Sequence, residues 1–191
     1  MGETVTNSGL RPPLIETPRL RLRPFDLGDA SALFEIASNP AVTRYTTWDA
    51  HRTVEESRAW INDHALPSYP EGAPGPVTIT LKRSGELIGA VGGRWATREN
   101  RCIEFGYWLG EPFWGRGFAT EAARALVDFF FRTFPVERVQ AHYLEGNTAS
   151  GRVLEKIGLR LEGVRRRALY RRDRFWDLHC YAVLRDDWPA G

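Results

Sequence analysis

Hydrophobic and polar positions alternate, or recur at helical spacing, along most of the chain. Leu20 and Leu22 alternate with three arginines, which predicts a strand with one buried face that ends at Pro24. The same reasoning predicts further strands over 77–81, 86–91, 101–109, 136–144, 159–169 and 175–184. The polar connection at 82–85, which ends in glycine, is typical of a hairpin.

Apolar residues three and four positions apart predict helices over 30–37, 54–66, 118–133 and 147–157. The 118–133 segment has the strongest pattern of the four. Asn39-Pro40 is expected to end the first helix, and Thr53 begins the second. Gly158 is well suited to end the last helix, because glycine adopts the left-handed conformation required there.

This order of elements indicates an α+β fold with one sheet. Hairpin-connected strands beside strand–helix–strand units predict a mixed, mostly antiparallel, twisted sheet of about seven strands, with about four helices on both faces. The chain has 191 residues, a length that suits one domain. We expect residues 1–13 to form a flexible tail, 67–76 a proline-rich loop, and 14–191 a single domain.

Composition and charge exclude several classes of protein. No stretch approaches the roughly 18 consecutive apolar residues that span a bilayer, so no membrane partner is expected. The net charge of +2 gives no general attraction to DNA. Cys102 and Cys180 are too few for a disulfide framework, and no signal peptide is recognisable, so we expect a cytoplasmic protein.

The segment with the clearest chemistry is a strand that runs into a glycine turn and then into the 118–133 helix. Such a turn directs free backbone N–H groups at one point, which suits a phosphate or diphosphate. Gly115 and Gly117 allow close approach because they lack a Cβ atom. A plain turn explains this pair of glycines equally well. A Walker loop is excluded because Gly117 is not followed by lysine, and a dinucleotide fingerprint is disfavoured by Thr120.

A second polar group begins the 147–157 helix. Asn147 can cap this helix, and capping alone would explain its presence. Ser150 lies on the same helical face as Val153, Leu154 and Ile157, so its hydroxyl should point inward. A buried hydroxyl is expected to have a hydrogen-bonding partner.

These two segments resemble one enzyme superfamily. Residues 114–122 read Trp-Gly-Arg-Gly-Phe-Ala-Thr-Glu-Ala, and residues 147–158 read Asn-Thr-Ala-Ser-Gly-Arg-Val-Leu-Glu-Lys-Ile-Gly. Both are similar to motifs of the GCN5-related N-acetyltransferases (GNAT). The segments 17–24, 162–164 and 184–188 resemble the RimJ/RimL-type branch, the ribosomal-protein N-terminal acetyltransferases. The resemblance covers nearly the whole chain.

The resemblance implies direct transfer of an acetyl group from acetyl-CoA to a primary amine within a ternary complex. It implies a protein N-terminal amine, such as that of a ribosomal protein, as the acceptor. It places the diphosphate of acetyl-CoA at the glycine turn and pantetheine beside 107–109. The residues expected to bind acetyl-CoA are Tyr107, Trp108, Leu109, Trp114, Gly115, Arg116, Gly117, Phe118, Ala119, Thr120, Asn147 and Ser150. Trp114 replaces a polar family residue, which removes one side-chain donor.

Glu104 is the candidate general base. It lies in the middle of a predicted central strand, and its neighbours on the same face, Cys102 and Gly106, are small. A buried carboxylate without a partner would be unfavourable by several kcal/mol. We expect Glu104 to accept the amine proton, directly or through water, or to bind the ammonium group. A structural ion pair with an arginine is the alternative.

The resemblance supplies the remaining catalytic roles. It implies that Ser150 donates a hydrogen bond to the leaving thiolate, and that Asn147 orients a substrate nearby. The backbone N–H of Trp108 or Leu109 is implied for the oxyanion. No pair of histidines has metal-ligand spacing, so no metal is expected.

Other functions remain open from sequence. The acceptor could be a small amine or an aminoglycoside, for which the acidic helix with Glu55, Glu56 and Asp63 is the first place to examine. The Arg165–Arg174 segment holds six arginines on a predicted hairpin; it is either a solvated hairpin or an RNA-binding module. A non-catalytic acyl-CoA sensor is a third possibility. The acceptor and the oligomeric state, a homodimer included, are not determined by the sequence.

Overall fold

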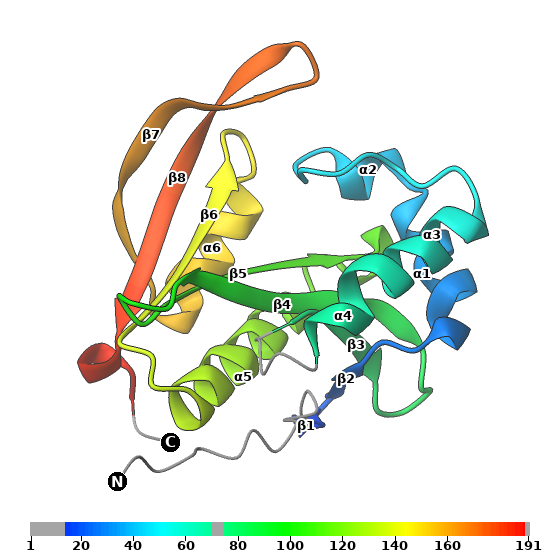
Figure 1. Cartoon of the computed structure of the whole chain (residues 1–191), viewed down its shortest axis with the longest axis horizontal. Coiled ribbons are helices and arrows are strands. Elements are labelled where there is room, and N and C mark those ends of the chain that lie inside the picture. Colours follow the sequence, from blue (N-terminus) through cyan, green and yellow to red (C-terminus); the bar gives the residue numbers. More distant parts are fainter. Residues whose placement is uncertain (1–13, 70–74, 190–191) are drawn as a thin grey trace, which may run out of the picture.

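A central sheet with the strand order β1-β2-β3-β4-β5-β6-β8-β7 organises the chain (Figure 1). The computed structural model describes residues 14–69 and 75–189. The expected tail at 1–13 and much of the expected 67–76 loop lie outside these ranges. The strands are β1 (Ile15–Glu16), β2 (Leu20–Pro24), β3 (Val77–Leu81), β4 (Leu87–Thr97), β5 (Cys102–Leu109), β6 (Arg138–Leu144), β7 (Arg160–Arg171) and β8 (Arg174–Leu184).

The mixed, mostly antiparallel sheet is confirmed. Within the described ranges, β5 and β6 form the one parallel pair and all other neighbours are antiparallel. The sheet has eight strands rather than about seven, because the two-residue strand β1 pairs with β2.

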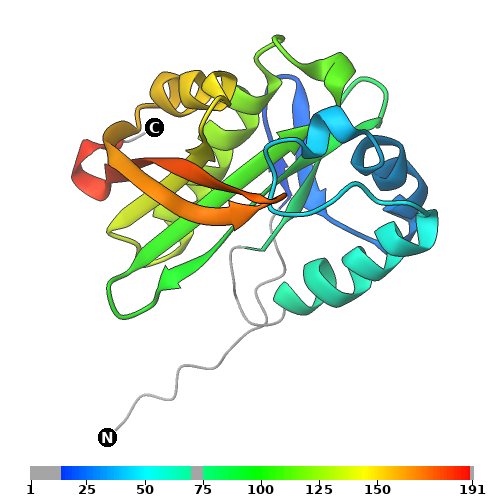
Figure 2. The same ribbon diagram turned by 90° about the horizontal axis from the view of Figure 1, so that it is seen from above.

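Helices cover both faces of the sheet, as expected. They are α1 (Ala30–Ala37), α2 (Pro40–Thr43), α3 (Val54–Trp60), α4 (Leu66–Ser68), α5 (Phe118–Thr133) and α6 (Thr148–Ile157). Figure 2 shows α3 and α6 on opposite sides of the sheet. One buried cluster joins α5 and α6 to the sheet, and a second joins α1 and α3 to its other face. None of the described helices is long and apolar enough to cross a lipid bilayer.

One predicted boundary was incomplete and another was wrong. Asn39-Pro40 does not only end a helix: the Asn39 side chain accepts a hydrogen bond from the Ala41 N–H at 2.8 Å and begins α2. Pro40 is tolerated at the first helical position, where its missing N–H has no intrahelical role. Strand β4 continues past the expected end at residue 91 to Thr97. The glycines at 92 and 93 do not end the strand, because both pair with β5. A Cβ atom at Gly93 would lie 2.8 Å from Phe130.

The parallel strands β5 and β6 separate soon after they begin. They pair at Cys102–Arg138, Ile103–Val139 and Glu104–Gln140, and no pairing follows. Figure 1 shows the two strands diverging, with α6 following β6 and α5 following β5. The β6-facing edge of residues 105–109 therefore has no strand partner among the described residues. This opening lies in the middle of the sheet, and it brings the candidate residues together.

Candidate active site

The glycine turn has the geometry of an anion-binding site. Gly115 and Gly117 have φ angles of +70° and +79°, a left-handed conformation that is unfavourable for residues with a Cβ atom. Gly117 is the residue before α5, and no side chain caps this helix. Within the described chain, the backbone N–H groups of residues 115–120 have no hydrogen-bond acceptor. These donors and the positive end of the α5 dipole are available to an anion.

Trp114 fixes the turn to the end of β5. Its indole Nε1 donates a hydrogen bond to the Leu109 carbonyl oxygen at 2.7 Å, while the residue remains 47 % exposed. The sequence indicated only that tryptophan removes a side-chain donor from the turn. The structure shows that the indole N–H of the tryptophan is used within the chain, where it holds the turn beside the unpaired edge of β5.

Asn147, Ser150 and Tyr107 meet on the α6 side of the opening. Asn147 precedes α6, and its side chain accepts a hydrogen bond from the Ser150 N–H at 3.4 Å, which agrees with its predicted capping role. The Tyr107 hydroxyl lies 2.8 Å from Ser150 Oγ and donates to the Ser150 carbonyl oxygen at 3.0 Å. Burial raises the pKa of Tyr107, so this hydroxyl remains protonated. The partner expected for Ser150 is therefore a side chain of β5.

Glu104 lies at the last position of β5 that pairs with β6, on the opposite face of the sheet from Tyr107. Its carboxylate accepts a hydrogen bond from Arg94 at 2.6 Å and one from Gln140 at 3.1 Å. His142 Nδ1 is 3.6 Å from Glu104 Oε2. The contact with His142 lowers the pKa of Glu104 to about 2, although burial alone raises it. Glu104 is therefore ionised at neutral pH.

The arginine partner considered from the sequence is present but exposed. The Arg94 side chain is 74 % exposed, and that of Glu104 is 16 % exposed. Solvent screens such an ion pair, so Arg94 can exchange this contact for water or a ligand. Gly106, next but one along β5, is exposed, and a Cβ atom there would meet nothing within 4 Å. The sheet face beside Glu104 is therefore accessible.

Sequence reasoning missed three site residues. His142 lies beside Glu104 because β6 runs parallel to β5, and a local pattern carries no information about that register. Thr17 and Arg19 contact Glu121 in the first turn of α5. Both residues belong to the 17–24 motif, which from sequence indicated only a family resemblance. The structure shows that this motif lies beside the glycine turn.

The arginine-rich hairpin is partly engaged within the chain. Arg172 donates to the Arg44 carbonyl oxygen at 2.8 Å and to the Thr43 carbonyl oxygen at 3.0 Å. Arg171 donates to Asp49 at 2.7 Å. These contacts fix the tip of the β7–β8 hairpin to the segment after α2, so neither arginine is a freely solvated contact for RNA.

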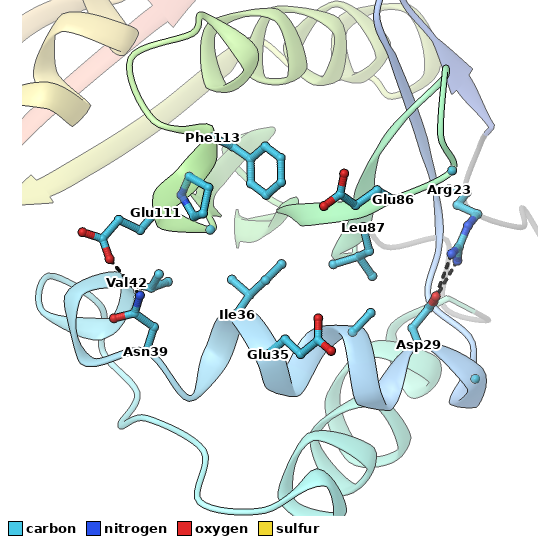
Figure 3. A pocket seen from close by; sticks show the side chains of 15 residues that line it. Arg23, Asp29, Glu35, Ile36, Asn39, Val42, Glu86, Leu87, Glu111 and Phe113 are labelled. Carbon is cyan, nitrogen blue, oxygen red and sulfur yellow. Dashed lines mark hydrogen bonds and ion pairs between the residues drawn. The ribbon is translucent and has the colours of Figure 1, made fainter.

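A separate cavity of about 510 Å³ lies between α1, the β3–β4 hairpin and the segment that precedes the glycine turn. Glu35 and Glu86 face it from opposite sides, and Asn39 donates to Glu111 at 2.9 Å on its wall (Figure 3). None of the predicted site residues lines it. In the part of the chain that the structure describes, no group of three or more His, Cys, Asp or Glu side chains is arranged to hold a metal ion.

Comparison with known proteins agrees with this geometry. Residues 19–160 match the model of the acetyltransferase (GNAT) domain. The chain is similar to the uncharacterised N-acetyltransferase p20 of Bacillus licheniformis, at 33 % identity over 91 % of this chain and 97 % of p20. It is 29 % identical to the ribosomal-protein-serine acetyltransferase of Escherichia coli, over 54 % of this chain and 58 % of that protein.

The fold is also that of a solved acetyltransferase. A crystal structure of a GNAT-family acetyltransferase from Bacillus anthracis superposes with a TM-score of 0.82 at 28 % identity, covering 91 % of this chain and 99 % of that one. The GNAT domain model extends over most of the sheet, the glycine turn and α6. The chain belongs to the GNAT family and is an acetyl-CoA-dependent N-acetyltransferase.

Proposed function

We propose that the acetyl acceptor of this enzyme is the N-terminal amine of a protein, and that the opening between β5 and β6 is where the amine meets the thioester. The observation that carries the proposal is the placement of polar groups around this opening. Ser150 and Tyr107 lie on one face of the sheet, Glu104 and His142 lie on the other, and the glycine turn follows the end of β5. The similarity to the E. coli ribosomal-protein-serine acetyltransferase favours a protein N-terminus over a small amine.

The chain's own groups fit acetyl-CoA. The N–H groups of residues 115–120 would bind the diphosphate, because they are donors without an intramolecular acceptor. The unpaired edge of Tyr107–Leu109 would bind the pantetheine amides as a neighbouring strand does. The N–H of Trp108 or Leu109 would stabilise the oxyanion that forms when the amine attacks.

Glu104 acts on the acceptor. A carboxylate with a pKa of about 2 holds a proton poorly at neutral pH, but it binds an ammonium group well. Glu104 therefore orients the acceptor, and the proton leaves the amine through water or through His142. A bond forms between nitrogen and the acetyl carbon, and the carbon–sulfur bond breaks.

Ser150 acts on the leaving group. The thiolate leaves with the electron pair of the carbon–sulfur bond, and a hydroxyl donor near the sulfur stabilises it. The protonated Tyr107 hydroxyl lies within hydrogen-bonding distance of Ser150 Oγ. Tyr107 thereby restricts the orientations of the serine hydroxyl.

Glu104→Gln should change the pH dependence of stability. The pKa of Glu104 is about 4.5 in the unfolded chain and about 2 in the folded protein. Ionised Glu104 therefore stabilises the fold, and this contribution is complete above about pH 4.5. This contribution is lost as the pH falls toward 2. Urea unfolding at pH 7, 5, 4 and 3 should show wild type more stable than the variant, with a difference that shrinks below pH 4.5. A difference that stays constant with pH would show that the charge of Glu104 is not what the fold uses. Glu99→Gln, at an exposed position in the β4–β5 turn, is the control.

Ser150→Ala should lower kcat by about 10²-fold, because a general acid contributes 10²–10⁴-fold to rate. The Kd of acetyl-CoA should remain near its wild-type value, since the ground-state thioester needs no proton. Thr148→Ala removes an exposed hydroxyl from the same helical turn and should leave kcat unchanged. An unchanged kcat in the Ser150 variant would exclude this residue from stabilising the leaving thiolate.

The acceptor class is tested by thiol release from acetyl-CoA with a panel of amines. The panel contains N-terminal peptides, the same peptides with a blocked α-amine, polyamines and aminoglycosides. Release that requires the free α-amine supports the proposal. Thiol release with aminoglycosides alone would contradict the proposal and identify an aminoglycoside as the acceptor. Acetyl-CoA binding without release for any amine would favour the sensor function.

A further inference from the structure

The opening motif of the chain is fastened to the first turn of α5. The carboxylate of Glu121 accepts three hydrogen bonds from it: from Thr17 Oγ1 at 2.6 Å, from the Arg19 backbone N–H at 2.9 Å and from Arg19 Nε at 2.6 Å. These hydrogen bonds lower the pKa of Glu121, although burial alone raises it. Residues about a hundred positions apart in sequence thus form one polar cluster beside the glycine turn.

The Arg19 guanidinium also contacts the turn itself. Its Nη1 donates to the Arg116 carbonyl oxygen at 3.0 Å, and its plane lies over the Phe118 ring at 4.5 Å from the centroid. One rigid, planar group therefore holds a carboxylate of α5 and a carbonyl of the turn at the same time. A guanidinium is suited to such forked contacts, because its donors have fixed relative directions.

The contact with Arg116 determines where a turn N–H points. The peptide bond between residues 116 and 117 is trans, so its carbonyl and its N–H point in opposite directions. Because Arg19 holds the carbonyl of Arg116, the N–H of Gly117 is directed away from the guanidinium. This N–H belongs to the set without an intramolecular acceptor.

Arg19 also compensates an unfavourable charge. The Glu121 carboxylate lies in the first turn of α5, close to where an anion would bind. An unpaired carboxylate there would repel a diphosphate. The ion pair with Arg19 offsets this repulsion, and Thr17 and the Arg19 backbone N–H donate to the same carboxylate.

We propose that Arg19 is a positioning residue for coenzyme A: with Thr17 and Glu121 it fixes the 116–117 peptide so that the turn presents its N–H groups to the diphosphate. The inference rests on the proposed binding of the diphosphate at this turn. The 17–24 motif contains none of the proposed catalytic residues, and the inference assigns it a role in cofactor binding. Arg19 is expected to affect affinity for coenzyme A and not the acetyl-transfer step.

Arg19→Lys tests this role, because lysine keeps the charge but cannot bond Glu121 and the Arg116 carbonyl as a fork. Titration calorimetry should show the Kd of CoA about 10-fold higher than in wild type, equivalent to about 1.4 kcal/mol. The KM for acetyl-CoA should rise similarly, while kcat at saturating acetyl-CoA stays within about twofold, since the interaction acts on ground-state binding.

Arg21→Lys is the matched control. Arg21 lies two residues further along, in β2, pairs with Glu16 at 3.0 Å, and its side chain is 51 % exposed against 48 % for Arg19. It does not contact the turn, so its substitution should leave the Kd of CoA unchanged. Arg19→Gln, too short to reach both partners, replaces the lysine variant if that variant does not fold, and the same rise in Kd is expected.

The outcomes separate the two proposals. Wild-type protein that does not bind CoA would refute binding at the turn and this inference with it. Wild-type protein that binds CoA, together with a folded Arg19→Lys variant of equal affinity, would overturn only the role of Arg19. A lower thermal midpoint with unchanged Kd would make Arg19 a structural residue and would also overturn the inference.

Discussion

The early separation of β5 and β6 is the constraint on which the site depends. Three paired residues keep the two strands in one sheet, and the remaining residues of β5 lose their neighbour. A backbone edge in the middle of a sheet normally has its hydrogen bonds satisfied by the next strand. Here the edge lacks a strand neighbour among the described residues, and we propose the pantetheine arm of acetyl-CoA as its partner, because pantetheine has amides of the right kind. The separation also gives one position access to both faces of the sheet.

Each face then contributes a different chemistry. The α6 side carries neutral hydroxyl donors in a buried setting, because Tyr107 bridges to Ser150. The other side carries an ionised carboxylate beside a histidine and an exposed arginine. Proton donation to sulfur and recognition of an ammonium group make opposite demands on charge, and the sheet itself keeps the two environments apart. The cavity beside α1 belongs to neither environment.

Local pattern was enough to predict the elements that carry the site. The α5 helix was expected at 118–133 and is found there, and Asn147 and Ser150 occupy the expected positions at the start of α6. The alternation of β5 correctly separated Glu104 from Tyr107. Contacts between elements that are distant in sequence could not be predicted from local pattern. The position of His142 depends on the parallel register, and the contact between Arg19 and Glu121 joins the first strands to a helix about a hundred residues later. The role of Trp114 was also not predictable from the sequence, because its indole N–H bonds the Leu109 carbonyl oxygen five residues earlier.

Backbone amide signals followed by NMR during titration with CoA test the central claim most directly. The account predicts that the amides of residues 115–120 shift most, as their free donors bind the diphosphate, and that the amides of residues 107–109 follow at the same CoA concentrations. Saturable binding of CoA that leaves the signals of residues 115–120 in place would contradict it.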